Sequence, residues 1–496
     1  MTKSLNPSVR IRMYRQGLGD CFLLTFSESN MPDFNMIIDC GLLQGTSNAK
    51  SIMNKVAEDI SAALTLEKEI DGVNKKWLDV VVLTHEHADH ISGFNQAKDV
   101  FENIHFGEVW VGWMEDESHP NYKAVRERFH KQADGLKAAL ARMNSNEQKG
   151  LKEAIGLMLD EFFDPNLLGA TGTGGRSAAW DFALKKSVAD PRFLTPGTTF
   201  PLADFGDIRI YILGPSEDFE SFTRVNPPED DTYRSEGAGF ALSDSFFAAA
   251  AANDTISAES FQPFEKRLRI ARLAAPSDQF FQAHYGFAPT GPEAWRRIDD
   301  DWLSVASVFA LRLDSYTNNT CLAFAIEFVS SGKVLLFPGD AQFSNWLSWQ
   351  KLSWQMLDGQ GGKVKVTTKD LLERTVFYKV GHHGSHNATL KKHGLEMMTN
   401  PELVAMIPVD REKAKSQTSK TNPNGWEMPE RNLFDRLMQR TRGRIVIADE
   451  KDGSELKKRC KDKAFLSNVQ FDGSFVRDET ISEADEPLYV ELTIKG

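Results

Sequence analysis

Short apolar runs bounded by turn residues alternate with helical spacing along the first part of the chain. Five segments there have the length and composition of strands, namely residues 9–13, 21–26, 35–39, 79–83 and 107–113. Between the third and fourth of them, apolar residues recur at helical spacing within residues 48–68. Strand, helix and strand in this order predict a sheet that is covered by helices.

The strand pattern returns in the second half of the chain. The expected strands lie at residues 207–213, 307–313, 320–328, 333–337, 376–380, 402–408 and 444–449. A helix around residues 433–438 precedes the last strand. Strands and helices thus alternate in both halves, which is typical of an α/β protein.

Two long segments separate these halves and differ in character. Residues 119–164 carry two apolar stripes at helical spacing with a turn at 144–146, which predicts an antiparallel helical hairpin. Residues 216–300 are the least regular part and predict a second insertion. The expected parts are a core half (1–115), a helical insertion (116–190), a return to the sheet (191–215), a second insertion (216–300), a second core half (301–460) and a C-terminal extension (461–496).

Composition narrows the class of protein. Of 496 residues, 41% are hydrophobic and 26% are charged, which is ordinary for a soluble globular protein. The net charge of −12 argues against broad, sequence-independent binding of long nucleic acids, which relies on a basic surface. The four cysteines are widely spaced, and neither a signal peptide nor an apolar run long enough to span a membrane is evident. We therefore expect a cytoplasmic protein that does not enter a membrane.

The largest concentration of potential metal ligands follows the apolar run that ends at Leu83. His85 and His87 are two positions apart, so in an extended segment their side chains point the same way. Asp89 and His90 are adjacent and can reach a neighbouring position. This spacing suits two metal ions side by side better than one. Mixed imidazole and carboxylate ligands favour zinc, with manganese or iron as alternatives.

Several motifs together resemble a known family. The order His-x-His-x-Asp-His at 85–90, followed by Ile-Ser-Gly at 91–93, resembles the signature of the metallo-β-lactamase superfamily. Gly-x-Gly-Asp at 17–20, Asp-x-Gly at 39–41 and Gly-His-His-Gly-Ser-His at 381–386 resemble the ComEC-like branch of that superfamily. The resemblance implies a four-layer αββα sandwich, here with two largely helical insertions.

The resemblance also implies a site for two divalent metal ions. The implied ligands are His85, His87, Asp89, His90, Asp340 and His383. The first two would hold one ion, Asp340 would bridge both ions, and the others would complete the second. His382 and His383 both remain candidates for the last ligand, and we favour His383, with His382 as a catalytic donor or acid that faces the substrate.

Two further positions are left open by the motifs. Asp89 is either a ligand or the catalytic base that orients the attacking hydroxide. Asp39 would lie beside the metals without binding them, or would simply cap a strand end. Many members of the superfamily supply another histidine after the first motif, but here none occurs before His119. Three alternatives follow: the first metal is one ligand short, it recruits Glu115 or Asp116, or it is weakly held.

These features predict a hydrolase that activates water at two metal ions. Two metals suit in-line attack on phosphorus, and the ComEC-like branch implies phosphodiester hydrolysis, so a nuclease or nucleotide phosphodiesterase is expected. The alternatives are hydrolysis of a small ester, amide or thioester, and a component of a multiprotein bacterial system, such as a defence system, that binds a partner or nucleotide. The expected partners are a phosphate-containing substrate, such as a nucleic acid or nucleotide, and a protein bound through the insertions.

Overall fold

The computed structural model describes residues 7–127, 177–218, 229–233, 274, 277–285, 315–357, 362–417, 424–473 and 486–496. The chain divides into two compact units. The first comprises Met1–Val125, Asp160–Ala238 and Asp314–Gly496, and the second comprises Arg126–Leu159 and Gly239–Leu313. All candidate site residues lie in the first unit.

The second unit is described only in small part, including α9 (Gln279–Tyr285). The expected helical hairpin beyond residue 127, most of the second insertion and the expected strand at 307–313 lie outside the described residues. The predicted division of the chain therefore stays a prediction where it concerns the two insertions.

The first sheet of the first unit has nine strands among the described residues. Its order is β17 (Val469–Asp472), β18 (Tyr489–Lys495), β1 (Ser8–Tyr14), β2 (Cys21–Ser27), β3 (Phe34–Cys40), β5 (Val73–Val82), β6 (Ile104–Gly112) and β7 (Arg192–Leu194), with β4 (Glu67–Ile70) paired to β5. Strands β1 to β3 are antiparallel, whereas β3, β5, β6 and β7 are parallel. The parallel strands are joined by helices, as the alternating pattern predicts.

The second sheet has seven strands in the part of the chain that the structure describes. Its order is β16 (Ile445–Ile447), β15 (Val404–Ile407), β14 (Thr375–Lys379), β11 (Lys333–Phe337), β10 (Ala323–Phe328), β9 (Phe205–Gly214) and β8 (Thr199–Leu202). Strands β11, β14, β15 and β16 are parallel, so their carboxyl ends meet at one edge. Ligands of α/β proteins commonly bind at such an edge.

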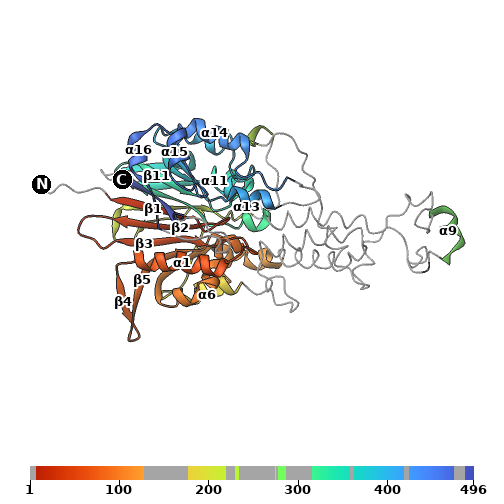
Figure 1. The fold of residues 1–496 in the computed structure, drawn as a ribbon, viewed down its shortest axis with the longest axis horizontal. Helices are drawn as coiled ribbons and strands as arrows, with labels where there is room; N and C mark the ends of the chain where they lie inside the picture. The colour runs from red at the N-terminus through yellow and green to blue at the C-terminus, as the bar shows by residue number, and fades with distance from the viewer. Residues whose placement is uncertain are drawn as a thin grey trace. The chain divides into compact units, whose positions relative to one another are not determined.

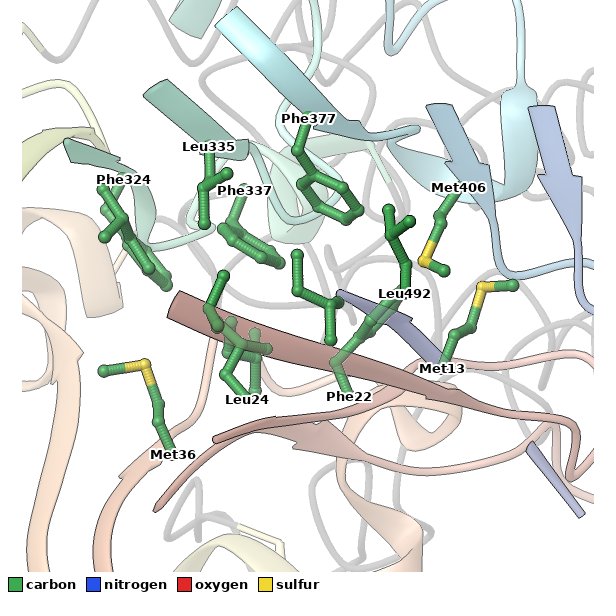
Figure 2. Packing of buried hydrophobic residues seen from close by; sticks show 14 of the residues in the cluster. Met13, Phe22, Leu24, Met36, Phe324, Leu335, Phe337, Phe377, Met406 and Leu492 are labelled. Atoms are coloured by element: carbon green, nitrogen blue, oxygen red, sulfur yellow. The ribbon is translucent and has the colours of Figure 1, made fainter. Parts of the chain in front are cut away.

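The two sheets face each other across an apolar core. Figure 2 shows Phe22 and Leu24 of the first sheet pointing toward Phe337 and Phe377 of the second. The other face of the first sheet packs against α1 (Ala49–Ala63), α2 (Ala88–Gln96), α3 (Lys98–Phe101) and α6 (Ala178–Lys186). On the second sheet, α11 (Phe343–Trp349), α12 (Thr368–Glu373) and α14 (Arg431–Thr441) contact the strands (Figure 1). The predicted αββα sandwich is thus confirmed.

The end of the chain differs from its expected place. Residues 461–496 were expected to form an extension, but β18 pairs with β1 along its whole length, from Ser8 with Lys495 to Tyr14 with Tyr489. Strand β17 then pairs with β18. Val490 and Leu492 are buried in the core between the sheets. The C-terminal residues therefore complete the first sheet.

No helix among the described residues is long and apolar enough to cross a membrane.

Candidate metal centre

The first histidine motif lies where a buried strand gives way to a helix. Val80, Val81 and Val82 of β5 are buried between β3 and β6. The chain leaves the sheet at Leu83 and enters α2 at Ala88, so Asp89 and His90 lie in the first helical turn. A carboxylate is favourable there because the helix N-terminus carries partial positive charge.

Two glycines let neighbouring loops press against the start of α2. A Cβ at Gly41 would lie 2.5 Å from the carbonyl carbon of Asp89, and one at Gly19 would lie 2.6 Å from the Asp89 carbonyl oxygen. The backbone amide of Asp20 donates to that same oxygen at 2.9 Å. The Gly-x-Gly-Asp and Asp-x-Gly motifs therefore set the position of the ligand-bearing turn.

His85 and His87 form the first candidate pair of ligands. His85 Nε2 and His87 Nδ1 are 3.1 Å apart, and both side chains are buried. Two atoms bound to one tetrahedral zinc at about 2.0–2.1 Å lie roughly 3.3–3.4 Å apart. The two ring nitrogens thus have the separation that a shared ion requires.

A second candidate group adjoins the first. Ligand atoms of Asp89, His90, Asp340 and His383 all lie within 4.8 Å of one another. His383 Nε2 is 3.0 Å from Asp89 Oδ2, and His90 Nε2 is 3.2 Å from Asp340 Oδ2. The His85 ring lies against the His90 ring, with centroids 4.1 Å apart. The structure thus brings all six predicted ligands into one buried region.

Three of these imidazoles have a hydrogen-bond partner at Nδ1, the ring nitrogen opposite the proposed metal-binding Nε2. His90 Nδ1 lies 2.8 Å from Asp39 Oδ2, and His383 Nδ1 lies 2.6 Å from the Pro408 carbonyl oxygen. His85 Nδ1 lies 3.1 Å from the Thr84 hydroxyl, which donates to Asp39. Metal-binding histidines are commonly oriented in this way, because the partner fixes which nitrogen is free for the metal. The structure places Asp39 behind His90, as the resemblance implies.

His382 occupies a different place from His383. It contributes no atom to the groups of close ligand atoms found among the described residues, and it is 9% exposed where His383 is 2% exposed. Its backbone amide donates to Asp340 Oδ1 at 2.9 Å. Both histidines have positive φ, 47° and 53°, a conformation that costs non-glycine residues roughly 1–3 kcal/mol. The strained turn holds the two ring centroids 6.0 Å apart, and of the two rings only that of His383 joins the close ligand atoms.

The electrostatics of the cluster follow from burial and opposite charges. Burial lowers the pKa of His87 to about 3, which keeps its imidazole neutral. Burial alone would raise the pKa of Asp89, but His90 and His383 outweigh it and lower the pKa to about 2. Burial would likewise raise the pKa of Asp340, but Lys379 and His90 hold it well below its ordinary value. Burial would lower the pKa of His90 and His383, but the carboxylates around them outweigh it and raise both pKa values. Metal binding would release these protons, since neutral imidazoles and ionised carboxylates are the forms that bind metals.

The sequence reasoning missed two charged residues of the site. Lys379 ends β14 and contacts both Asp20 and Asp340, at 3.0 Å from Asp340 Oδ1. Asp20 was noted only as part of the Gly-x-Gly-Asp motif at 17–20, and Lys379 only as part of the strand expected at 376–380. A lysine inside an otherwise apolar strand was the available signal, since a buried ammonium requires an acidic partner.

The expected replacement for the missing third histidine is not found among the described residues. Neither Glu115 nor Asp116 belongs to a group of close ligand atoms there. Asp116 instead accepts from the Ser118 amide at 2.9 Å, and His119 lies 3.1 Å from Glu217. The part of the chain that the structure describes thus shows no group of three close ligand atoms that joins either Glu115 or Asp116 to His85 and His87.

An αββα sandwich with a buried cluster of histidines and aspartates is the arrangement expected of a metal-dependent hydrolase. Residues 15–146 match the family model of the metallo-beta-lactamase superfamily, so this part of the chain is similar to that superfamily. That segment includes the first histidine motif, whereas Asp340 and His383 lie beyond it. No match was found among curated proteins.

The role of Asp39 can be tested directly. We expect Asp39→Asn to weaken metal binding by about 10–100-fold, because an amide NH₂ group cannot accept the His90 Nδ1–H hydrogen bond. Competition with a chelator measures the affinity. Asp79→Asn is a matched control, since Asp79 accepts from Asn35 and Trp77 in the same sheet without contacting a candidate ligand. Equal metal affinity in the two variants would show that Asp39 does not support metal binding through His90.

Proposed function

We propose that this chain hydrolyses phosphodiesters at a centre of two zinc ions, as a nuclease or nucleotide phosphodiesterase. The observation that carries the proposal is the adjacency of two ligand groups. The His85 and His87 nitrogens suit one ion, and the second group, with Asp89 and His383, suits another. Two adjacent ions fit a reaction in which one oxygen attacks phosphorus and another leaves.

The side chains present fit this pair of ions. The buried atoms that have no hydrogen-bond partner among the described residues include Asp89 Oδ1, His90 Nε2 and His382 Nδ1 of this site. Leaving buried polar atoms unsatisfied is costly unless a ligand completes them. When bound, two divalent ions supply a water of lowered pKa and positive charge for the oxygens of the substrate.

The chain's own residues have separate roles in this proposal. Asp340 would be the ligand that both ions share, and Asp89 would either bind the second ion or orient the attacking water. His382 is 9% exposed, more than any of the four histidines that would bind the ions, and this exposure suits a residue that meets the substrate. It would hold or donate a proton at the leaving oxygen through its ring.

The ComEC-like branch and a cytoplasmic location belong to the same proposal. The Gly-His-His-Gly-Ser-His motif and the Gly-x-Gly-Asp motif support the branch, since Asp20 and His383 lie together, 3.8 Å apart. The net charge of −12 favours a small nucleotide or a short strand over a long duplex as the substrate.

The substrate class is tested with a panel assayed in parallel on the zinc-loaded protein. The panel contains bis(p-nitrophenyl) phosphate, a cyclic nucleotide, single-stranded DNA and RNA, p-nitrophenyl acetate and a thioester. We expect turnover of the phosphodiesters that a chelator abolishes and added zinc restores. Turnover of the esters alone would replace the proposal by a small-ester hydrolase. Nucleotide binding without any turnover would favour a binding component of a larger assembly.

A further inference from the structure

Lys379 is the one charged side chain of β14, whose other described residues are apolar or hydroxyl-bearing. It is only 2% exposed, although it carries an ammonium group. Its Nζ contacts Asp20 Oδ2, Asp340 Oδ1 at 3.0 Å and the Gly339 carbonyl oxygen at 3.1 Å. An ammonium has three donors, so these three acceptors satisfy it completely.

The two oxygens of Asp340 therefore have different surroundings. Oδ1 receives two hydrogen bonds, from Lys379 Nζ at 3.0 Å and from the His382 amide at 2.9 Å. Oδ2 faces His90 Nε2 at 3.2 Å, close to the separation of two ligands on one metal. A carboxylate fixed at one oxygen by two donors cannot rotate to present both oxygens to metals without breaking those bonds.

We infer that Lys379 is a positioning residue that reserves Oδ1 of Asp340 and leaves Oδ2 as the only oxygen that faces the metal ions. The inference rests on the proposed metal centre and specifies how its bridging ligand works. In this arrangement Asp340 would offer only Oδ2 to the metal ions. A carboxylate that bridged with one oxygen on each ion would need Oδ1 free of Lys379.

Asp20 completes this device because it balances the charge of Lys379. The two side chains contact each other in the buried interior, with Asp20 2% exposed. A lone buried ammonium would cost far more than a paired one, and it would oppose the entry of divalent cations. The pair adds no net charge beside the ligands, so it holds Asp340 in place without repelling the metals.

The test measures zinc binding rather than activity alone. Lys379→Met keeps roughly the length of the side chain and removes its donors. We expect it to weaken binding of the more tightly bound zinc ion by about 10–100-fold, as measured by competition with a chelator. Tyr378→Phe is the matched control, since Tyr378 is the buried neighbour on β14 and bonds Thr389 rather than the site. That variant should bind zinc as the unaltered chain does. Should Lys379→Met fail to fold, Asp20→Asn tests the same device and is expected to weaken zinc binding in the same direction.

A zinc-loaded crystal structure of the unaltered chain provides a second readout. We expect only Oδ2 of Asp340 within coordination distance of zinc, with Lys379 still bonded to Oδ1. Zinc bound to both oxygens, or Lys379→Met that folds and binds zinc with unchanged affinity, would overturn the inference while the metal centre stands. An unaltered chain that binds no zinc would instead overturn the proposed function.

Discussion

Replacing Asp340 by alanine is expected to lower kcat/KM for a phosphodiester by on the order of 10³-fold or more. Asp340 is 1% exposed and lies between His90 and Lys379. It belongs to the second group of candidate ligands, with Asp89, His90 and His383. Removing a charged ligand withdraws several kcal/mol of stabilisation from the charge that develops in the transition state, and each 1.4 kcal/mol is tenfold in rate. Steady-state kinetics with bis(p-nitrophenyl) phosphate measure the loss.

Two companion variants separate chemistry from stability. Asp340→Asn keeps the size of the side chain but loses its charge, and it should also be strongly impaired. Asp207→Ala removes a surface carboxylate that bonds Ser330, and it should retain full activity. Near-normal turnover by Asp340→Ala would show that this carboxylate takes no part in the reaction.

The largest loss of stability is expected for Phe337→Ala. Phe337 is 1% exposed, and its ring stacks on the Phe324 ring with the centroids 5.6 Å apart. The ring of Phe22, from the opposite sheet, contacts it with the centroids 6.4 Å apart. Removing it leaves a cavity between the sheets, for which a loss of about 3–5 kcal/mol in the free energy of unfolding is typical. Urea unfolding followed by circular dichroism measures the change.

A surface phenylalanine provides the comparison for Phe337. Phe193 of β7 is 39% exposed, and Phe193→Ala should change the free energy of unfolding by only about 0.5 kcal/mol. If Phe337→Ala were as stable as Phe193→Ala, the facing of the two sheets seen in Figure 2 would be contradicted.

The ligands of the first motif were predictable because their chemistry is local. All four of these ligands, from His85 to His90, fall within six positions after one strand. Asp340 and His383 were predictable only through the resemblance, since each follows a strand end and nothing local joins it to the first motif. The structure brings these segments together, although their assignment as metal ligands stays a prediction until metal is measured.

Residues that support the ligands were harder to foresee. Lys379 has no local signal beyond its place in an apolar strand, and its acidic partner Asp20 lies hundreds of positions earlier in the chain. Such long-range pairs depend on how the two sheets meet, which the periodicity of single strands does not encode.

The fold shows the same division between local and distant information. The apolar patterns predict β1 and α14 within a few residues, because each of these elements buries one face. They do not reveal strand partners, so the C-terminal strand β18 was set apart although it pairs with β1. Val490 and Leu492 of β18 are buried only because this strand joins a sheet, and the strand it pairs with, β1, lies at the other end of the chain.

The most direct test of the two-metal centre is anomalous diffraction at the zinc edge from crystals of the zinc-loaded chain. We predict two peaks roughly 3.5–4 Å apart. One should lie beside His85 and His87, and the other among Asp89, His90 and His383, with Asp340 between them. A single peak, or peaks away from these side chains, would contradict the dinuclear centre.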